Sequence, residues 1–250
     1  MTEYFWSPAP GDASFANPAN WSIRAADGSL VPANAVPTAN DTATIASPIT
    51  GGDPRSPFTV DTFDIESGTL VGSFAANSAT INRGSLDGDL VASALEVKGT
   101  GAGQALSQFG SGSVTAVDGT FQVDEQARAE FTDATLDVAT LLVGDDSDGS
   151  LPAELSFAGS SGSFTVEQSV RIGQSANDTG IPDRLDLEYG AQAAVADALY
   201  VGDGDGSNGE LEVGTGATIE VQGAAYLGFA GQSKGTIDLT SAKSMSTSCW

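Results

Sequence analysis

The residues best suited to chemistry in this chain are oxygen-bearing side chains in two glycine-rich segments. Three lie in the first segment and three in the second: Asp145, Asp146, Asp148, Asp203, Asp205 and Asn208. Such oxygens on a flexible loop are ligands that Ca²⁺ prefers. Neither segment completes an EF-hand, because the twelfth position counted from Asp203 is Gly214. Since Asp-Gly and Asn-Gly are also what tight turns require, two interpretations stay open: Ca²⁺ sites, or turns without a metal.

Catalytic chemistry has little support elsewhere in the sequence. The chain has no histidine, which removes Ser-His-Asp and Cys-His nucleophiles and most zinc sites. The enzymatic option that is left is cleavage of a glycan by paired carboxylates. Its candidates are Asp186, Glu188, Glu210, Glu212 and Glu220. We expect these to be solvated surface groups, and we predict no catalytic residue and no cofactor beyond the Ca²⁺ option.

The charge balance restricts the partners. There are 33 acidic residues against 9 basic ones, a formal net charge of −24. Such a chain repels phosphate backbones and anionic lipid surfaces, so we expect neither nucleic-acid binding nor membrane insertion. No apolar run approaches the length of a membrane span. The first residues also lack the basic and apolar regions of a secretory signal.

The elements that must position these residues are short strands in an internal repeat. Four apolar pairs end in Gly144, Gly173, Gly202 and Gly228, at intervals of 29, 29 and 26 residues. A polar loop follows each glycine. An apolar-x-apolar triplet comes next, in residues 155–157, 185–187, 211–213 and 237–239. Alternation of this kind is typical of a strand with one buried face.

A second triplet follows some eight residues later, in residues 164–166, 193–195 and 219–221, so each repeat holds three short strands. Three such strands per repeat predict an all-β chain folded as a single-stranded right-handed parallel β-helix (β-solenoid), with almost no α-helix. Successive coils stack, so that backbone groups pair with the coil above and below. The inward positions predicted from the alternation are Ile172, Leu187, Val201, Val213, Ile219, Val221 and Leu239.

The two ends depart from the repeat. The first 50 or so residues contain Trp6, Trp21 and six of the ten prolines, and the chain closes on Cys249 and Trp250. A repeat fold needs an atypical terminal unit over its first coil, so the N-terminal segment is a cap or, alternatively, a docking site. We predict a cap or docking segment at 1–55, a solenoid at 56–240 and a tail at 241–250. These four aromatic and thiol side chains are the candidate partner-binding residues, and the single cysteine forms no intrachain disulfide.

The N-terminal stretch contains two characteristic segments, Asn17-Pro18-Ala19-Asn20-Trp21 and Asn40-Asp41-Thr42-Ala43-Thr44-Ile45. Later units follow the pattern Glu-Leu-x-Val-x-x-Gly-Ala-x-Ile-x-Val. Together these motifs resemble the β-helix repeats of autotransporter passengers and of exosortase-sorted bacterial surface proteins. The resemblance covers most of the chain and implies the fold rather than an activity. The chain departs from both families, since it shows no export signal, membrane barrel or anchor segment.

These departures favour a non-enzymatic structural or attachment protein of a phage virion, either a capsid decoration or a tail or head fibre. The expected partners are capsid or tail proteins, or a host-surface receptor, bound through the ends of the solenoid, and self-association is a further option. One alternative is a bacterial cell-surface adhesin of the autotransporter-passenger type. Another is a β-helix glycan depolymerase.

Overall fold

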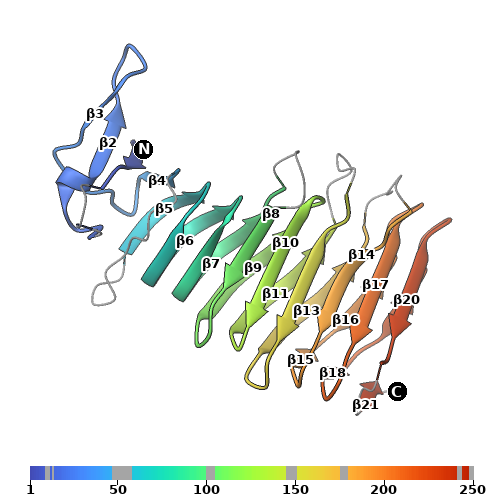
Figure 1. The fold of residues 1–250 in the computed structure, drawn as a ribbon. Coiled ribbons are helices and arrows are strands. Elements are labelled where there is room, and N and C mark those ends of the chain that lie inside the picture. The colour runs from blue at the N-terminus through green and yellow to red at the C-terminus, as the bar shows by residue number, and fades with distance from the viewer. Residues whose placement is uncertain are drawn as a thin grey trace.

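The computed structural model describes residues 1–8, 12, 14–46, 58–99, 105–144, 151–174, 180–240 and 244–247. These residues form 21 β-strands joined in one long sheet (Figure 1). Apart from the single 3-10 turn η1 (Pro18–Asn20), the described residues contain no helix. The prediction of an all-β chain is therefore confirmed for this part. None of its elements is a helix long and apolar enough to cross a membrane.

Short strands alternate with turns along the whole described chain. In chain order they are β1 (Glu3–Trp6), β2 (Trp21–Arg24), β3 (Leu30–Pro32), β4 (Thr42–Ile45), β5 (Phe58–Ile65), β6 (Thr69–Ile81), β7 (Gly84–Val97), β8 (Ala105–Phe109), β9 (Val114–Val123), β10 (Ala127–Thr132), β11 (Thr135–Val143), β12 (Glu154–Ala158), β13 (Ser163–Ile172), β14 (Asp183–Leu187), β15 (Gln192–Val195), β16 (Ala198–Val201), β17 (Asn208–Val213), β18 (Thr218–Val221), β19 (Ala225–Leu227), β20 (Lys234–Asp238) and β21 (Ser244–Thr247).

Most pairings are parallel and join strands that lie one repeat apart. One ladder runs β8, β10, β12, β14, β17, β20, and a second runs β9, β11, β13, β15, β18, β21. A third joins the end of β13 to β16 and β19. The triplets found in the sequence are in register, since Leu155 pairs with Leu185, Leu185 with Leu211 and Leu211 with Ile237.

The strands between Phe58 and Val97 follow a shorter repeat than the rest. Phe58 pairs with Phe74 and Thr69 with Ser85, an offset of 16 residues in each case. The strands here are long, and Gly72 of β6 lies beside Gly88 of β7. A Cβ on Gly88 would collide with the carbonyl of Gly72. This short period explains why the repeat is hard to recognise in the middle of the sequence.

The inner side of the ladders forms the hydrophobic core. Six of the seven predicted inward positions are buried: Ile172, Leu187, Val201, Val213, Ile219 and Val221. Leu239 is the exception, because its side chain is 48% exposed. It follows the end of β20, the last strand of its ladder, and no later described strand packs over it. The expected burial of Leu239 is therefore wrong.

Candidate functional site

The second glycine-rich segment is held by hydrogen bonds and an ion pair within the protein. Asp203 forms an ion pair with Arg171, whose guanidinium lies 4.3 Å from the Tyr200 ring centroid. Asp205 Oδ1 accepts from the Gln232 N–H at 3.0 Å. These contacts favour the interpretation of the segment as a turn.

The third residue of this segment is held in the same way, because Asn208 Nδ2 donates to the Gly180 carbonyl at 3.0 Å. Asp203, Asp205 and Asn208 thus each contact a different group of the protein. In the described chain, no group of three or more His, Cys, Asp or Glu side chains is placed to hold a metal ion. Asp145, Asp146 and Asp148 lie outside the described residues.

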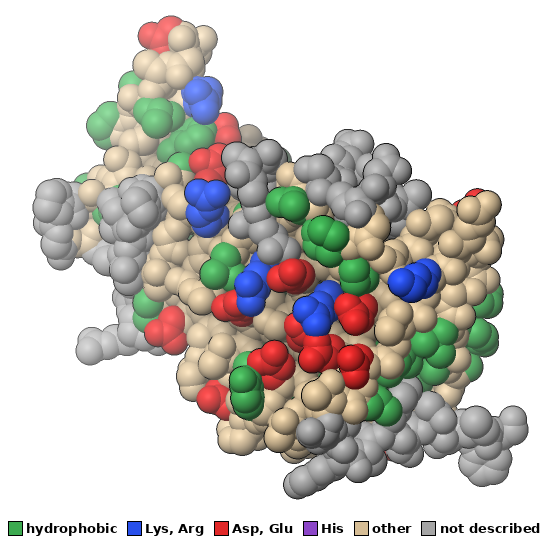
Figure 2. Space-filling model, turned by 45° about the vertical axis from the view of Figure 1, so that its right-hand side comes forward, with side chains coloured by type: hydrophobic (Ala, Val, Ile, Leu, Met, Phe, Trp, Pro, Cys, Tyr) green, Lys and Arg blue, Asp and Glu red, His purple; other side chains and the backbone are tan. Residues whose placement is uncertain are grey.

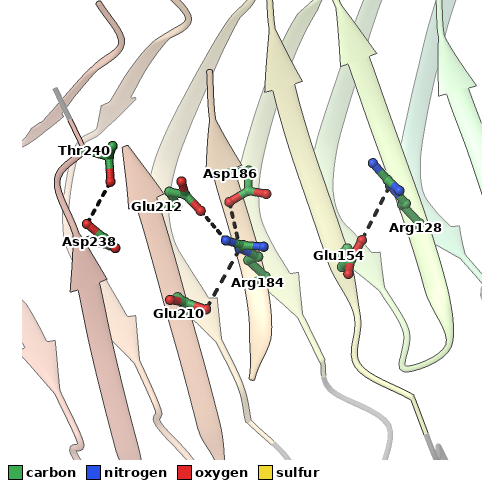
Figure 3. A network of polar contacts seen from close by, with 8 residues as sticks. All are labelled: Arg128, Glu154, Arg184, Asp186, Glu210, Glu212, Asp238 and Thr240. Atoms are coloured by element: carbon green, nitrogen blue, oxygen red, sulfur yellow. Dashed lines mark hydrogen bonds and ion pairs between the residues drawn. The ribbon is translucent and has the colours of Figure 1, made fainter. Parts of the chain in front are cut away.

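A network of charged side chains covers the outer face of the first ladder (Figures 2 and 3). Arg184 on β14 lies at its centre, with Nε 3.0 Å from Asp186 Oδ1 and 3.9 Å from Glu210 Oε2. Its guanidinium also pairs with Glu212. Three of the five glycan-cleavage candidates therefore meet around one arginine.

The same network extends toward the N-terminus through Arg128. Its Nε lies 3.5 Å from Glu154 Oε2, and Glu154 is in register with Arg184. In-register side chains on neighbouring strands are about 5 Å apart, so like charges would repel. The alternation of Arg128, Glu154, Arg184 and Glu210 along this row relieves that repulsion, which gives these two arginines a structural role.

Asp186 is the carboxyl group of this network with a shifted pKa. Burial raises its pKa to about 7, and the charges of Glu212, Glu188 and Glu154 add to the rise, while Arg184 opposes it. A raised carboxyl pKa is what a general acid in glycan cleavage requires. Around Arg184, however, Asp186, Glu210 and Glu212 all contact one guanidinium on the outer face, and that arrangement indicates a structural network.

A hollow of about 280 Å³ lies on the outer side of the second ladder. Three acidic side chains line it, Asp118, Asp137 and Glu167, and no sequence motif marks them. Residues 118, 137 and 167 fall in different strands, so their proximity depends on the register and is not visible in the sequence. Among the described residues, no aromatic side chain lines the hollow, so these residues offer no ring on which a sugar could stack.

The two N-terminal tryptophans belong to a buried aromatic cluster. Trp21 stacks on Phe58 of β5 with ring centroids 5.6 Å apart, and its Nε1 donates to the Phe15 carbonyl at 2.9 Å. Phe15 also contacts Trp6 and Phe74. Both tryptophans are buried, as the capping interpretation requires. Neither side chain is exposed to a partner in this conformation.

The opposite end of the ladders has no comparable cover in the described chain. Leu227 and Phe229 are 51% and 58% exposed, and Tyr226 is partly exposed. Val201 lies one repeat before Leu227 and pairs with it, and Val201 is fully buried. Tyr226 stacks on Tyr200 with centroids 4.9 Å apart. We call Tyr226, Leu227, Phe229 and Leu239 the C-terminal apolar surface. Cys249 and Trp250, the other candidate partner-binding residues, lie outside the described residues.

Comparisons with known proteins give no relative from which a function could be transferred. No family model matches the chain, and neither a curated protein nor a solved structure is similar to it. The fold and the surfaces described above therefore have to indicate the function by themselves.

Proposed function

We propose that the chain is a right-handed β-solenoid and acts as a non-enzymatic structural or attachment protein that binds another protein through its C-terminal end. The pairing of the strands supports the solenoid. In each of three ladders, a strand pairs in register with the strand that lies one repeat later in the sequence. Each repeat then corresponds to one coil. A rigid rod of this kind has repetitive sides and two unique ends.

The observation that carries the proposal is the difference between the two ends. At the N-terminal end, Trp6, Phe15 and Trp21 pack over the phenylalanines of β5 and β6. At the C-terminal end, Leu227 and Phe229 occupy the last coil and are more than half exposed. Apolar and aromatic side chains at the centre of an interface contribute most of its binding energy. The uncovered end is therefore the surface best suited to a protein partner.

The non-enzymatic part of the proposal is supported by the contacts that the carboxylates make. Those around Arg184 contact this arginine, and the chain has no histidine to serve as a general base. The setting that we propose is a phage virion, where the partner would be a capsid or tail protein. On a bacterial surface, the alternative setting, the same end would bind a receptor protein.

Point variants at the exposed end provide the experiment. Leu227→Ser and Phe229→Ser alter exposed side chains, so the fold should survive. Val91→Ser is a matched control, because Val91 is 50% exposed on the side of the rod, in β7. We expect the first two variants to reduce incorporation into particles, or attachment to cells, by tenfold or more, and the control to leave it unchanged.

Two results would count against end-on attachment. Normal incorporation of the double variant Leu227→Ser/Phe229→Ser would show that the end is not the contact surface. Loss of incorporation in Val91→Ser alone would move the contact to the sides of the rod. Glycan degradation by the purified protein, abolished by Asp186→Asn, would contradict the non-enzymatic assignment.

A further inference from the structure

Tyr189 is the most exposed aromatic side chain of the described residues, at 70%. It lies in the corner between β14 and β15, where its φ of 49° falls in the left-handed region that bulky residues rarely adopt. One repeat later, Thr215 occupies the same corner position and has no positive φ. The corner can therefore be built without this conformation, and backbone strain that the fold does not require often marks a ligand contact.

A hollow of about 150 Å³ opens beside Tyr189. The residues that line it come from the last three repeats of the first ladder and the corners that follow them: Glu188, Tyr189, Glu212, Gly214, Thr215 and Thr240. Thr240 follows Leu239 of the C-terminal apolar surface in the chain. The hollow therefore adjoins the surface through which attachment is proposed.

The carboxylates at the hollow exceed the positive charge that the protein provides there. Glu212 pairs with Arg184, which also contacts Asp186 and Glu210 (Figure 3). Glu188 forms no ion pair with any basic side chain of the described residues. Burial is the main cause of the raised pKa of Asp186, and the charges of Glu212 and Glu188 add to the rise. This side of the hollow thus has an excess of negative charge.

Elsewhere the chain completes the same combination of a ring and a carboxylate with an arginine. Such an arginine lies over a ring and pairs with a carboxylate in two places, Arg171 with Tyr200 and Asp203, and Arg24 with Phe5 and Glu3. The guanidinium carbon lies 4.3 Å from the ring centroid in the first case and 4.8 Å in the second. A planar guanidinium suits both contacts, since it stacks on a ring and donates to a carboxylate at the same time. At Tyr189, no basic side chain of the described residues lies over the ring.

We propose that the hollow beside Tyr189 binds an arginine side chain of the protein partner. In the complex, the guanidinium lies over the Tyr189 ring and donates to the Glu188 carboxylate. This inference rests on the proposed function for the nature of the partner, and it adds that an arginine flanks the apolar contact. Interfaces combine an apolar centre with a polar rim and are enriched in arginine. The formal net charge of −24 also favours a partner with basic side chains.

Titration of purified full-length protein with acetyl-arginine amide tests this recognition without the partner. Labelling with ¹³C-tyrosine gives ring signals from four tyrosines, and the Tyr189 signal is assigned by its loss in Tyr189→Asn. We expect this signal to shift saturably with a millimolar Kd, and the neutral isostere acetyl-citrulline amide to cause no shift. Glu188→Gln should weaken binding at least threefold. Glu220→Gln removes the same charge from an exposed position of β18 and should leave binding unchanged.

The absence of a shift would overturn the arginine site. Equal shifts with the arginine and citrulline amides would overturn it too, as would equal losses in Glu188→Gln and Glu220→Gln, which would indicate diffuse attraction.

Attachment assays separate this proposal from end-on attachment itself. Tyr189→Asn should fold, because asparagine adopts a positive φ more readily than tyrosine, and should reduce incorporation into particles, or attachment to cells, at least threefold. Leu227→Ser/Phe229→Ser should bind acetyl-arginine amide like the wild type. Normal attachment of Tyr189→Asn, with a loss in the double variant, would retain end-on attachment and remove the arginine contact.

Discussion

Replacement of Phe131 by alanine should be one of the most damaging single changes in the chain. Phe131 is fully buried in β10. It stacks between Phe109, with centroids 4.1 Å apart, and Phe157, at 4.7 Å. These three rings occupy in-register positions of successive strands, so the stack follows directly from the ladder.

The expected loss is about 3–5 kcal/mol of the free energy of unfolding, the usual cost of a buried Phe→Ala change. Two aromatic pairs at roughly 0.5–1.5 kcal/mol each account for about 1–3 kcal/mol of this, and the cavity accounts for the rest. Phe131→Leu keeps most of the volume and loses only the ring stacking. Its cost should therefore be below about 2 kcal/mol, close to that of other volume-conserving core changes.

The assay is urea denaturation followed by far-UV circular dichroism. Thr132→Ala is the control, because Thr132 is the next residue of β10 and is exposed. It should change the stability by less than about 0.5 kcal/mol. Equal losses in Phe131→Ala and Thr132→Ala would refute the register, and a loss under about 1 kcal/mol in Phe131→Ala would refute the continuous aromatic stack.

Three further predictions follow from burial and charge. Val213→Asp places a charge in the core and should cost roughly 3–5 kcal/mol of the free energy of unfolding. Glu212→Ala, at an outward position, should cost less than about 1 kcal/mol in the same denaturation assay. Similar losses would show that the two side chains do not face opposite sides. Trp21→Ala should cost roughly 3–5 kcal/mol, and a solvent-exposed Trp21 emission spectrum in a variant without the other tryptophans would contradict the cap. Because burial raises the folded-state pKa of Asp183 to about 7, its protonated form stabilises the fold at low pH. This contribution is lost as the pH rises from about 4 to 7, by up to about 1.4 kcal/mol per pH unit. Asp183→Asn should remove this part of the pH dependence, and identical pH profiles for the two proteins would contradict the assignment.

The sequence was sufficient for the strands whose alternation and glycine spacing repeat without interruption. Leu185 and Leu211 lie where the triplet pattern predicts, because burial on one face of a strand imposes a period of two. Leu239 follows the same pattern but is exposed, since burial also depends on a following strand that alternation cannot reveal. The burial of Trp21 could be expected from the need to cover the first coil.

The candidate sites were harder to derive, because they depend on which residues become neighbours across strands. Asp183 resembles a turn carboxylate in the sequence. Only the register shows that Asp183 belongs to a row of alanines and glycines. The acidic hollow around Asp137 has the same origin. In both cases the signal lies between the repeats rather than within one of them.

End-on attachment is tested most directly by site-specific photo-cross-linking in intact particles or on cells. A photoreactive phenylalanine analogue at position 229 probes the C-terminal apolar surface, and the same analogue at position 91, in β7, probes the side of the proposed solenoid. We predict one discrete cross-linked protein from position 229 and none from position 91. A cross-link from position 91 with none from position 229 would contradict attachment through the end.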